Sequence, residues 1–303
     1  MIIGSRSLLL EAGRIVQAKP NHQNDTSAPP AARPQITLAG RIAYRVLPLR
    51  RQVVRANLRR AFGEALTETD RARLAQAFYS HLLRSVWEFL QAPFMRTESR
   101  KARVRVESQE VVQEAMRSGR GVLLLAGHLG NWEIACADGI LSCPELRGHL
   151  HVIRRPIAPK WLDRYVRARF HRAGIGTIPK KDAMRSILDR LAANDAVAFV
   201  LDQSTATSEA VRVKFFGSAA WTSRSLAVVA RRTKAIVIPI ATWRERDGKH
   251  VLRFEAPLAP IAGRDLDEAI RLNTQLYNDT LERLIRRHPE QWNWIHRRWK
   301  SES

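Results

Sequence analysis

The chain has 303 residues, a length that one large α/β domain can occupy. Its composition, 45% hydrophobic and 26% charged, is that of a globular protein and excludes a fibre or wholesale disorder. Lys and Arg number 51 against 29 Asp and Glu, which gives a net charge of +22. This excess indicates an anionic partner: nucleic acid, an anionic membrane, a phosphorylated lipid or an acidic carrier protein.

Cysteine content and hydropathy indicate the cellular compartment of the protein. The two cysteines, Cys136 and Cys143, exclude a disulfide framework, favour a reducing compartment and lack the spacing of zinc ligands, so we expect no metal. No stretch approaches the roughly 20 apolar residues that span a bilayer. The amino terminus is interrupted by Arg6, Glu11 and Arg14 and does not resemble a signal peptide. We therefore expect a cytoplasmic protein that rests on a membrane without crossing it.

Three regions follow from composition along the chain. Residues 1–36 are predicted to be a flexible segment that ends in a proline-rich linker. Residues 37–95 are predicted to be a basic, helical, membrane-proximal region, and residues 96–303 the main α/β domain.

An arginine-rich segment opens the helical region. Seven arginines lie between residues 41 and 62 without an acidic residue, and Val54, Leu58 and Phe62 recur every fourth position after Pro48. This spacing predicts a basic amphipathic helix. Two interpretations stay open: the helix lies in an anionic membrane interface, or it docks on the domain with its arginines in water.

A second helix is predicted after Thr67, which forms a capping box with Asp70, and Pro93 ends it. Its long, regular apolar row is expected to pack on the protein. The row consists of Leu74, Phe78, Leu82, Val86 and Leu90, backed by Leu83 and Trp87.

Strand-like and helix-like stretches alternate beyond residue 105. Strands are predicted at 121–128, 151–156, 196–203, 236–243 and 251–258, and helices at 108–118, 160–173, 182–193, 222–232 and 265–287. This alternation predicts an α/β fold with a mostly parallel sheet flanked by helices.

The segment GHLGNWE, residues 127–133, is the strongest candidate for chemistry. His128 ends the most apolar strand, where open α/β sheets place their ligands, and Asn131 is placed to cap the following helix. We expect the Glu133 carboxylate to hold one imidazole nitrogen, leaving the other to take a proton from a hydroxyl. The alternative is a strand-end histidine bound only to backbone.

Competing catalytic motifs are absent from the sequence. It has no G-x-S-x-G elbow, no phosphate-binding loop and no H-E-x-x-H pair. Cys136 lies in an apolar stretch and is expected to pack rather than to act as a nucleophile. The substrate itself would therefore supply the nucleophile.

Five blocks in order carry a resemblance to a known family. They are GHLGNWE, RRP at 154–156, DQS with VRVKFFG at 202–204 and 211–217, the stretch from Thr222 to Pro239, and HPEQWNWIHRRWK at 288–300. Together they resemble the bacterial lauroyl/myristoyl acyltransferases of lipid A biosynthesis, from about Arg50 to Lys300. The wider group includes phosphatidylinositol mannoside acyltransferases and shares an H-x4-D/E motif with glycerolipid acyltransferases. Family members carry a hydrophobic anchor near the amino terminus, whereas this chain has a polar linker and an arginine-rich helix.

The resemblance implies a glycerolipid-acyltransferase-like fold, with residues 96–303 as the acyltransferase domain. It implies transfer of an acyl chain from a thioester, on acyl carrier protein or coenzyme A and without a cofactor, to a hydroxyl of a membrane glycolipid. The acceptor would be a lipid A precursor at the cytoplasmic face of the inner membrane. A phosphatidylinositol mannoside is the alternative acceptor.

The same resemblance implies roles for individual residues. His128 matches the general base and Glu133 its partner acid, while Arg155 matches a basic position suited to a phosphate. Further substrate-binding positions are Asn131, Asp202, Gln203, Lys214, Phe216, Gly217, Arg297 and Arg298. Structural roles stay open for these, and for Phe216 a place in the core is the competing interpretation.

A nucleic-acid-binding protein is the competing class. Trp292, Trp294 and Trp299 alternate with basic residues, a pattern that suits base stacking or a membrane interface. No helix-turn-helix, zinc-finger or RNP motif supports nucleic acid, and the family blocks favour lipid.

Overall fold

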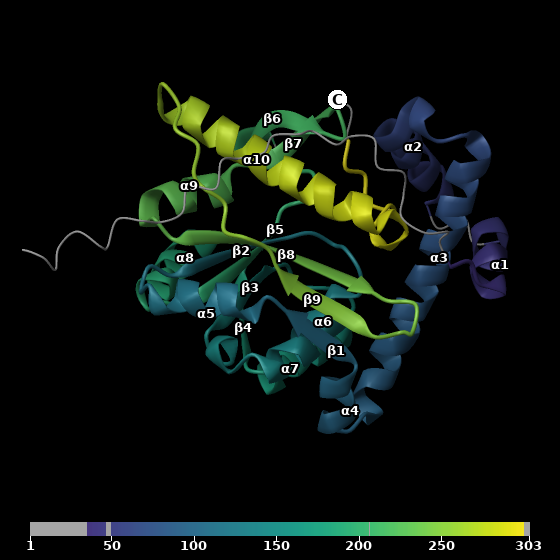
Figure 1. Ribbon diagram of the computed structural model, residues 1–303, viewed down its shortest axis with the longest axis horizontal. Helices are drawn as coiled ribbons and strands as arrows, with labels where there is room; N and C mark the ends of the chain where they lie inside the picture. The colour runs from purple at the N-terminus through teal and green to yellow at the C-terminus, as the bar shows by residue number, and fades with distance from the viewer. Residues whose placement is uncertain (1–34, 47–49, 206, 300–303) are drawn as a thin grey trace, which may run out of the picture.

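The computed structural model describes residues 35–46, 50–205 and 207–299 (Figure 1). All but the last two residues of the predicted flexible segment 1–36 lie outside this range.

The core is a seven-stranded sheet in the order β1-β9-β8-β2-β5-β3-β4. Strands β8, β2, β5, β3 and β4 run parallel, β9 returns antiparallel to β8, and β1 pairs parallel with β9. The mostly parallel sheet is therefore confirmed. The strands are β1 Val104–Glu107, β2 Val122–Ala126, β3 Leu150–Arg154, β4 Ile175–Pro179, β5 Ala196–Val200, β8 Ile236–Arg244 and β9 His250–Phe254.

Helices cover both faces of the sheet (Figure 1). Leu123 and Leu125 of β2 point into the core beneath α8, α9 and α10, and Val122 and Leu124 into the core beneath α5, α6 and α7. This alternation explains why β2 is apolar throughout. The helices are α5 Gln109–Arg117, α6 Trp132–Gly139, α7 Lys160–Arg172, α8 Ala183–Ala192, α9 Ser225–Thr233 and α10 Leu266–Arg287.

Four helices precede the sheet, and short 3₁₀ turns occur along the chain. The helices are α1 Leu38–Val46, α2 Arg51–Phe62, α3 Glu68–Gln91 and α4 Thr97–Ala102. The 3₁₀ turns are η1 Gly63–Ala65, η2 Ala92–Phe94, η3 Ile140–Ser142, η4 Pro144–Leu146, η5 Thr207–Glu209 and η6 Pro289–Gln291.

The arginine-rich helix is α2, and it is docked on the domain. Val54 and Leu58 are completely buried, while Arg55 and Arg59 approach Glu68 on the surface. The apolar row of α2 is thus used by the core. It is not available for insertion into a membrane.

Helix α3 begins as predicted, because the Thr67 hydroxyl accepts a hydrogen bond from the Asp70 amide at 3.1 Å. Its row of apolar residues packs only in the first half. Leu74 and Phe78 are buried, whereas Val86, Trp87 and Leu90 are 50%, 60% and 56% exposed. The expectation that the whole row packs on the protein is therefore wrong, since the outer face of the second half lies open.

A hairpin that the sequence analysis did not predict joins β5 to α9. Strands β6 Ala210–Phe215 and β7 Ser218–Ser223 are connected by Phe216 and Gly217, both at positive φ. Such a two-residue turn fits the twist of a hairpin. Phe216 is buried in an aromatic cluster, as the competing interpretation of a core position expects. Gly217 serves the turn, and the Lys214 side chain is exposed.

The carboxyl-terminal block is part of the core. Trp292, Trp294 and Trp299 are buried against the hairpin, so they form neither a membrane interface nor a stacking surface for bases. Arg298 is fully buried and donates to the Trp221 carbonyl at 2.7 Å. Its predicted substrate role is therefore wrong, whereas Arg297 is exposed.

Burial predicts contrasting effects of two matched substitutions. Leu58→Ala should lower the free energy of unfolding by about 2–5 kcal/mol because it leaves a cavity. Leu90→Ala, at an exposed position, should change it by less than about 0.5 kcal/mol. Urea denaturation of both variants measures the difference, and equal losses would contradict the packing of α2 and α3.

Candidate active site

His128 and Asp202 meet at the carboxyl-terminal edge of the sheet, after the adjacent strands β2 and β5. The His128 imidazole lies with Nδ1 2.8 Å from Asp202 Oδ1, and the His128 backbone amide donates to Asp202 Oδ2 at 2.6 Å. The Trp292 indole donates to the same Oδ2 at 2.7 Å. Asp202 thus fixes the histidine through both its main chain and its side chain.

The second imidazole nitrogen, Nε2, is in contact with the side chain of Gln203. With Nδ1–H donating to Asp202, Nε2 is an acceptor, and the Gln203 amide nitrogen lies 3.2 Å from it. Gln203 is exposed, while the His128 side chain keeps 21% of its surface. Nε2 is therefore within reach of a substrate group that displaces Gln203.

The charges around the pair favour a protonated His128 ring next to an ionised Asp202 carboxylate. Burial disfavours the imidazolium, but the charge of Asp202 and its hydrogen bond outweigh burial and raise the pKa of His128. Burial likewise opposes ionisation of Asp202, yet the charge of His128 and the hydrogen bonds from His128 and Trp292 lower the pKa of Asp202 to about 2. This arrangement stabilises positive charge on the ring.

Backbone contacts hold the loop that carries His128. Its carbonyl accepts from the Asn293 amide at 3.1 Å, and the Gly130 amide donates to the Gln291 carbonyl at 2.9 Å. Gly130 has a φ of +64°, and a Cβ there would lie 2.5 Å from the Thr242 carbonyl oxygen. Only glycine fits this turn.

The Asn131 side chain anchors the loop to a buried ionic network instead of making a cap hydrogen bond to α6. Its amide donates to Glu88 at 3.0 Å, and Glu88 also accepts from Arg244 at 2.6 and 2.8 Å. Burial opposes ionisation of Glu88, but bonds from His250 and Arg244 outweigh it and hold its pKa well below the usual range. Asn131 is the N-cap residue of α6 as predicted, but its side chain makes no cap hydrogen bond because its amide is bonded to Glu88.

Glu133 lies in the first turn of α6, close enough to raise the pKa of His128 through its charge. Among the contacts of the described residues it has no hydrogen bond to His128. The carboxylate expected on an imidazole nitrogen is therefore present but comes from Asp202. Burial raises the pKa of Glu133, against the opposing charges of Arg169, His128 and Arg154.

The remaining predicted residues are spread over the surface. Arg155 follows β3 at the sheet edge that carries His128, is exposed, and has no ion pair within the described part of the chain. Its neighbour Arg154 pairs with Asp163 at 2.5 Å. Lys214 and Arg297 make no hydrogen bond to His128 or Asp202 among the described contacts.

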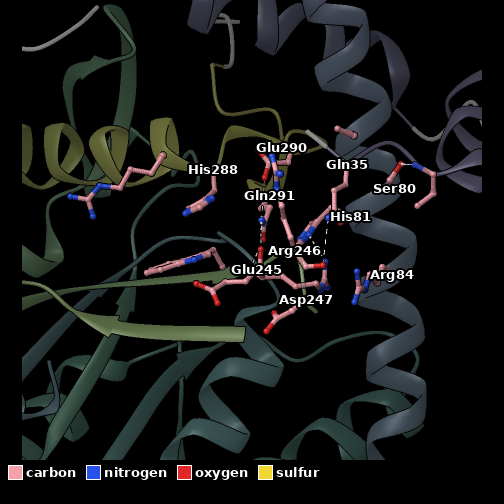
Figure 2. A pocket seen from close by; sticks show the side chains of 15 residues that line it. Gln35, Ser80, His81, Arg84, Glu245, Arg246, Asp247, His288, Glu290 and Gln291 are labelled. Carbon is pink, nitrogen blue, oxygen red and sulfur yellow. Dashed lines mark hydrogen bonds between the residues drawn. The ribbon is translucent and has the colours of Figure 1, made fainter. Parts of the chain in front are cut away.

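A pocket of about 520 Å³ lies between α3, the end of β8 and η6 (Figure 2). None of the predicted site residues lines it. Its wall includes Arg244 and Gln291, which hold the loop of His128. Arg84 in the same wall pairs with Glu88 at 3.4 Å, so this pocket belongs to the supporting network rather than to the chemistry.

Other chemistries find little support in the structure. Burial raises the pKa of both Cys136 and Cys143 to about 12, so neither is an activated nucleophile. Across residues 35–46, 50–205 and 207–299, no helix has the length and apolar content to cross a membrane.

The site described so far pairs His128 with the buried Asp202 at the carboxyl ends of neighbouring parallel strands of an α/β sheet. A family model described as "Bacterial lipid A biosynthesis acyltransferase" matches residues 27–301. The chain belongs to this family and is an O-acyltransferase.

Relatives of low sequence identity are also named as transferases of acyl chains. The lipid A biosynthesis lauroyltransferase of Escherichia coli (strain K12) is 25% identical over 86% of this chain and 83% of its own. The palmitoleoyltransferase of the same strain is 26% identical over 88% and 83%. The phosphatidylinositol mannoside acyltransferase of Mycolicibacterium smegmatis (strain ATCC 700084 / mc(2)155) is 24% identical over 81% and 78%. The crystal structure of the acyltransferase PlsC from Thermotoga maritima superposes with a TM-score of 0.34 at 15% identity, covering 79% and 97%.

The contact between His128 and Asp202 predicts that a substitution of Asp202 shifts the pKa of His128. In Asp202→Asn burial remains but the opposing charge is lost, so the pKa of His128 should fall below its ordinary 6.5. Because the pKa of His128 is raised in the folded protein, the pair stabilises the fold fully below pH 6.5, the ordinary pKa of histidine. This stabilisation of the fold declines as the pH rises through the raised pKa of His128. NMR titration, assigned with His128→Gln, measures the shift.

Asp195→Asn is the matched control. Asp195 precedes β5 and contacts His149 at 2.7 Å at the opposite edge of the sheet. This variant should leave the titration of His128 unchanged. A His128 pKa that is equal in the parent and in Asp202→Asn would show that the two residues are not coupled.

Proposed function

We infer that the protein transfers an acyl chain from a thioester, carried by acyl carrier protein, to a hydroxyl of a lipid A precursor. The observation that carries this proposal is His128, held at Nδ1 by buried Asp202, with only the exposed Gln203 side chain, among the described residues, bonded at Nε2. The family and the names of the relatives support the acceptor class. A net charge of +22 suits an acidic carrier and a phosphorylated lipid.

His128 acts as the general base. Nε2 takes the proton as the acceptor oxygen attacks the thioester carbonyl, and Asp202 and Glu133 stabilise the imidazolium. Collapse of the tetrahedral intermediate breaks the carbon–sulfur bond, and His128 returns the proton to the leaving thiolate. The substrate provides the nucleophile, so the reaction proceeds without a protein nucleophile and without a cofactor beyond the thioester.

The cytoplasmic face of the inner membrane is the proposed site of action, where an acyl carrier protein and a glycolipid precursor can meet. Among alternative acceptors, a phosphatidylinositol mannoside is favoured by the similarity to the mycobacterial relative. The tryptophan pattern no longer supports a nucleic-acid partner, because Trp292, Trp294 and Trp299 are buried and cannot stack on bases.

Substitutions of the base test the mechanism. His128→Ala should lower kcat by about 10²–10⁴-fold, the usual worth of general-base help. Glu133→Gln should lower it less, because Asp202 still supports the ring. Transfer of labelled acyl chains from acyl carrier protein to a lipid A precursor measures both, with Asp195→Asn as a control expected at parental rate.

A thermal melt of each variant separates lost chemistry from lost folding. Parental transfer by a folded His128→Ala variant would remove His128 from the reaction. Parental transfer by folded Glu133→Gln would remove Glu133 alone.

Arg155 is proposed to bind a phosphate of the acceptor. Arg155→Ala should raise the acceptor KM with little change in kcat, as expected for lost uniform binding. Arg172→Ala, an exposed arginine at the far end of α7, should leave both constants unchanged. Equal KM values for Arg155→Ala and the parent would assign Arg155 to the surface alone.

A further inference from the structure

Six large apolar side chains are exposed where helices α3 and α7 meet, and we name them the apolar rim. They occupy the end of α3, the η2 turn and the start of α7: Val86, Trp87, Leu90, Phe94, Ile157 and Trp161. Phe94 is 89% exposed and Trp161 is 67% exposed. Clustered apolar exposure of this kind marks an interaction surface.

The rim lies on two helices that contact each other. Helix α3 exposes Val86 and Trp87 on its outer face, while Glu88 on its inner face holds Asn131 in the loop of His128. Phe89 packs edge-on against Tyr165 of α7, with ring centroids 5.2 Å apart. Trp161 lies one helical turn before Tyr165. Ile157 and Trp161 follow β3 at the carboxyl-terminal end of the parallel strands, which is also the end that carries His128. A partner seated on the rim would therefore lie at the same end of the sheet as His128.

Tryptophan is divided unevenly between the rim and the rest of the chain. The sequence has eight tryptophans, and the two exposed ones, Trp87 and Trp161, both lie in the rim. The other six, all within the described residues, are buried or half-buried: Trp132, Trp221, Trp243, Trp292, Trp294 and Trp299. Exposed indole rings favour the headgroup level of a bilayer.

The charges around the rim suit an anionic bilayer. Exposed basic residues occur in both segments, 84–96 and 154–167: Arg84, Arg96, Arg155, Lys160, Arg164 and Arg167. The only acidic residues in these segments are Glu88 and Asp163. Both pair with arginines of the protein, so the charge left for a partner is positive.

We propose that the apolar rim seats on an anionic lipid bilayer and brings His128 to the acceptor hydroxyl at the membrane surface. The inference rests on the proposed function, because it identifies the surface that presents the acceptor. Helix α2 cannot supply this contact with its apolar row, which is buried. Indole and phenyl groups enter the interface while the surrounding arginines meet lipid phosphates.

Vesicle binding of the full chain tests the proposal. The probe is vesicles of phosphatidylethanolamine and phosphatidylglycerol, and the variant is Trp87→Ser/Leu90→Ser/Phe94→Ser, which changes only exposed positions. The matched control is Leu38→Ser/Ile42→Ser/Val46→Ser, which removes three exposed apolar residues of α1. Co-sedimentation should show binding weakened by about tenfold or more for the rim variant and near parental for the α1 variant.

Two outcomes would overturn the proposal. One is a rim variant that binds these vesicles as the parent does. The other is a parent that dimerises in light scattering, does not bind vesicles, and becomes monomeric on substitution of the rim; that result would assign the rim to a second copy of the chain.

Activity measurements separate this proposal from the proposed function. With the acceptor in detergent micelles, the rim variant should turn over within about threefold of the parent, and it should lose activity only on vesicles. His128→Ala should bind vesicles as the parent does without transferring acyl chains. Absence of acyl transfer by the parent would contradict the proposed function while the binding result for the rim stands.

Discussion

The buried Asp202 carboxylate is the contact on which the site depends. It accepts from the His128 amide, the His128 ring and the Trp292 indole, so one ionised group joins the ends of β2 and β5 to the carboxyl-terminal segment. An ionised carboxylate inside a protein is costly unless it is fully bonded. The same three bonds that make its burial tolerable fix the tautomer and direction of His128. The carboxylate that joins these segments is therefore also the group that orients the proposed base.

The surrounding structure keeps that carboxylate enclosed. Trp292 packs against Phe215 of the β6–β7 hairpin, and the Asn57 side chain donates to the Trp294 carbonyl at 2.8 Å, which connects the same segment to α2. On the other side, the Glu88–Arg244 pair holds Asn131. The loop of His128 is thus clamped between α3 and the carboxyl-terminal segment, and the arginine-rich helix acts as a structural support of the site.

Periodicity predicted the strands and helices that have strong patterns, such as β2 and α10, and the position of His128 at a strand end. It did not reveal which strand lies beside β2. That neighbour, β5, supplies Asp202, so the partner acid was sought at Glu133, nearby in sequence. Asp202 follows β5 as His128 follows β2, and this strand-end position was the available signal. Tertiary burial overrode pattern elsewhere: Arg298 and the tryptophans suggest a surface when taken alone, but the hairpin covers them.

The bond between Asp202 and Trp292 spans 90 residues of sequence. During synthesis the sheet strands β2 and β5 leave the ribosome well before Trp292 does. Until then Asp202 lacks its indole donor and the carbonyl of His128 lacks the Asn293 amide. The bonds that hold His128 and Asp202 are therefore completed only after η6 has been made, so a nascent chain stalled before η6 would carry the sheet without the contacts that fix the proposed base.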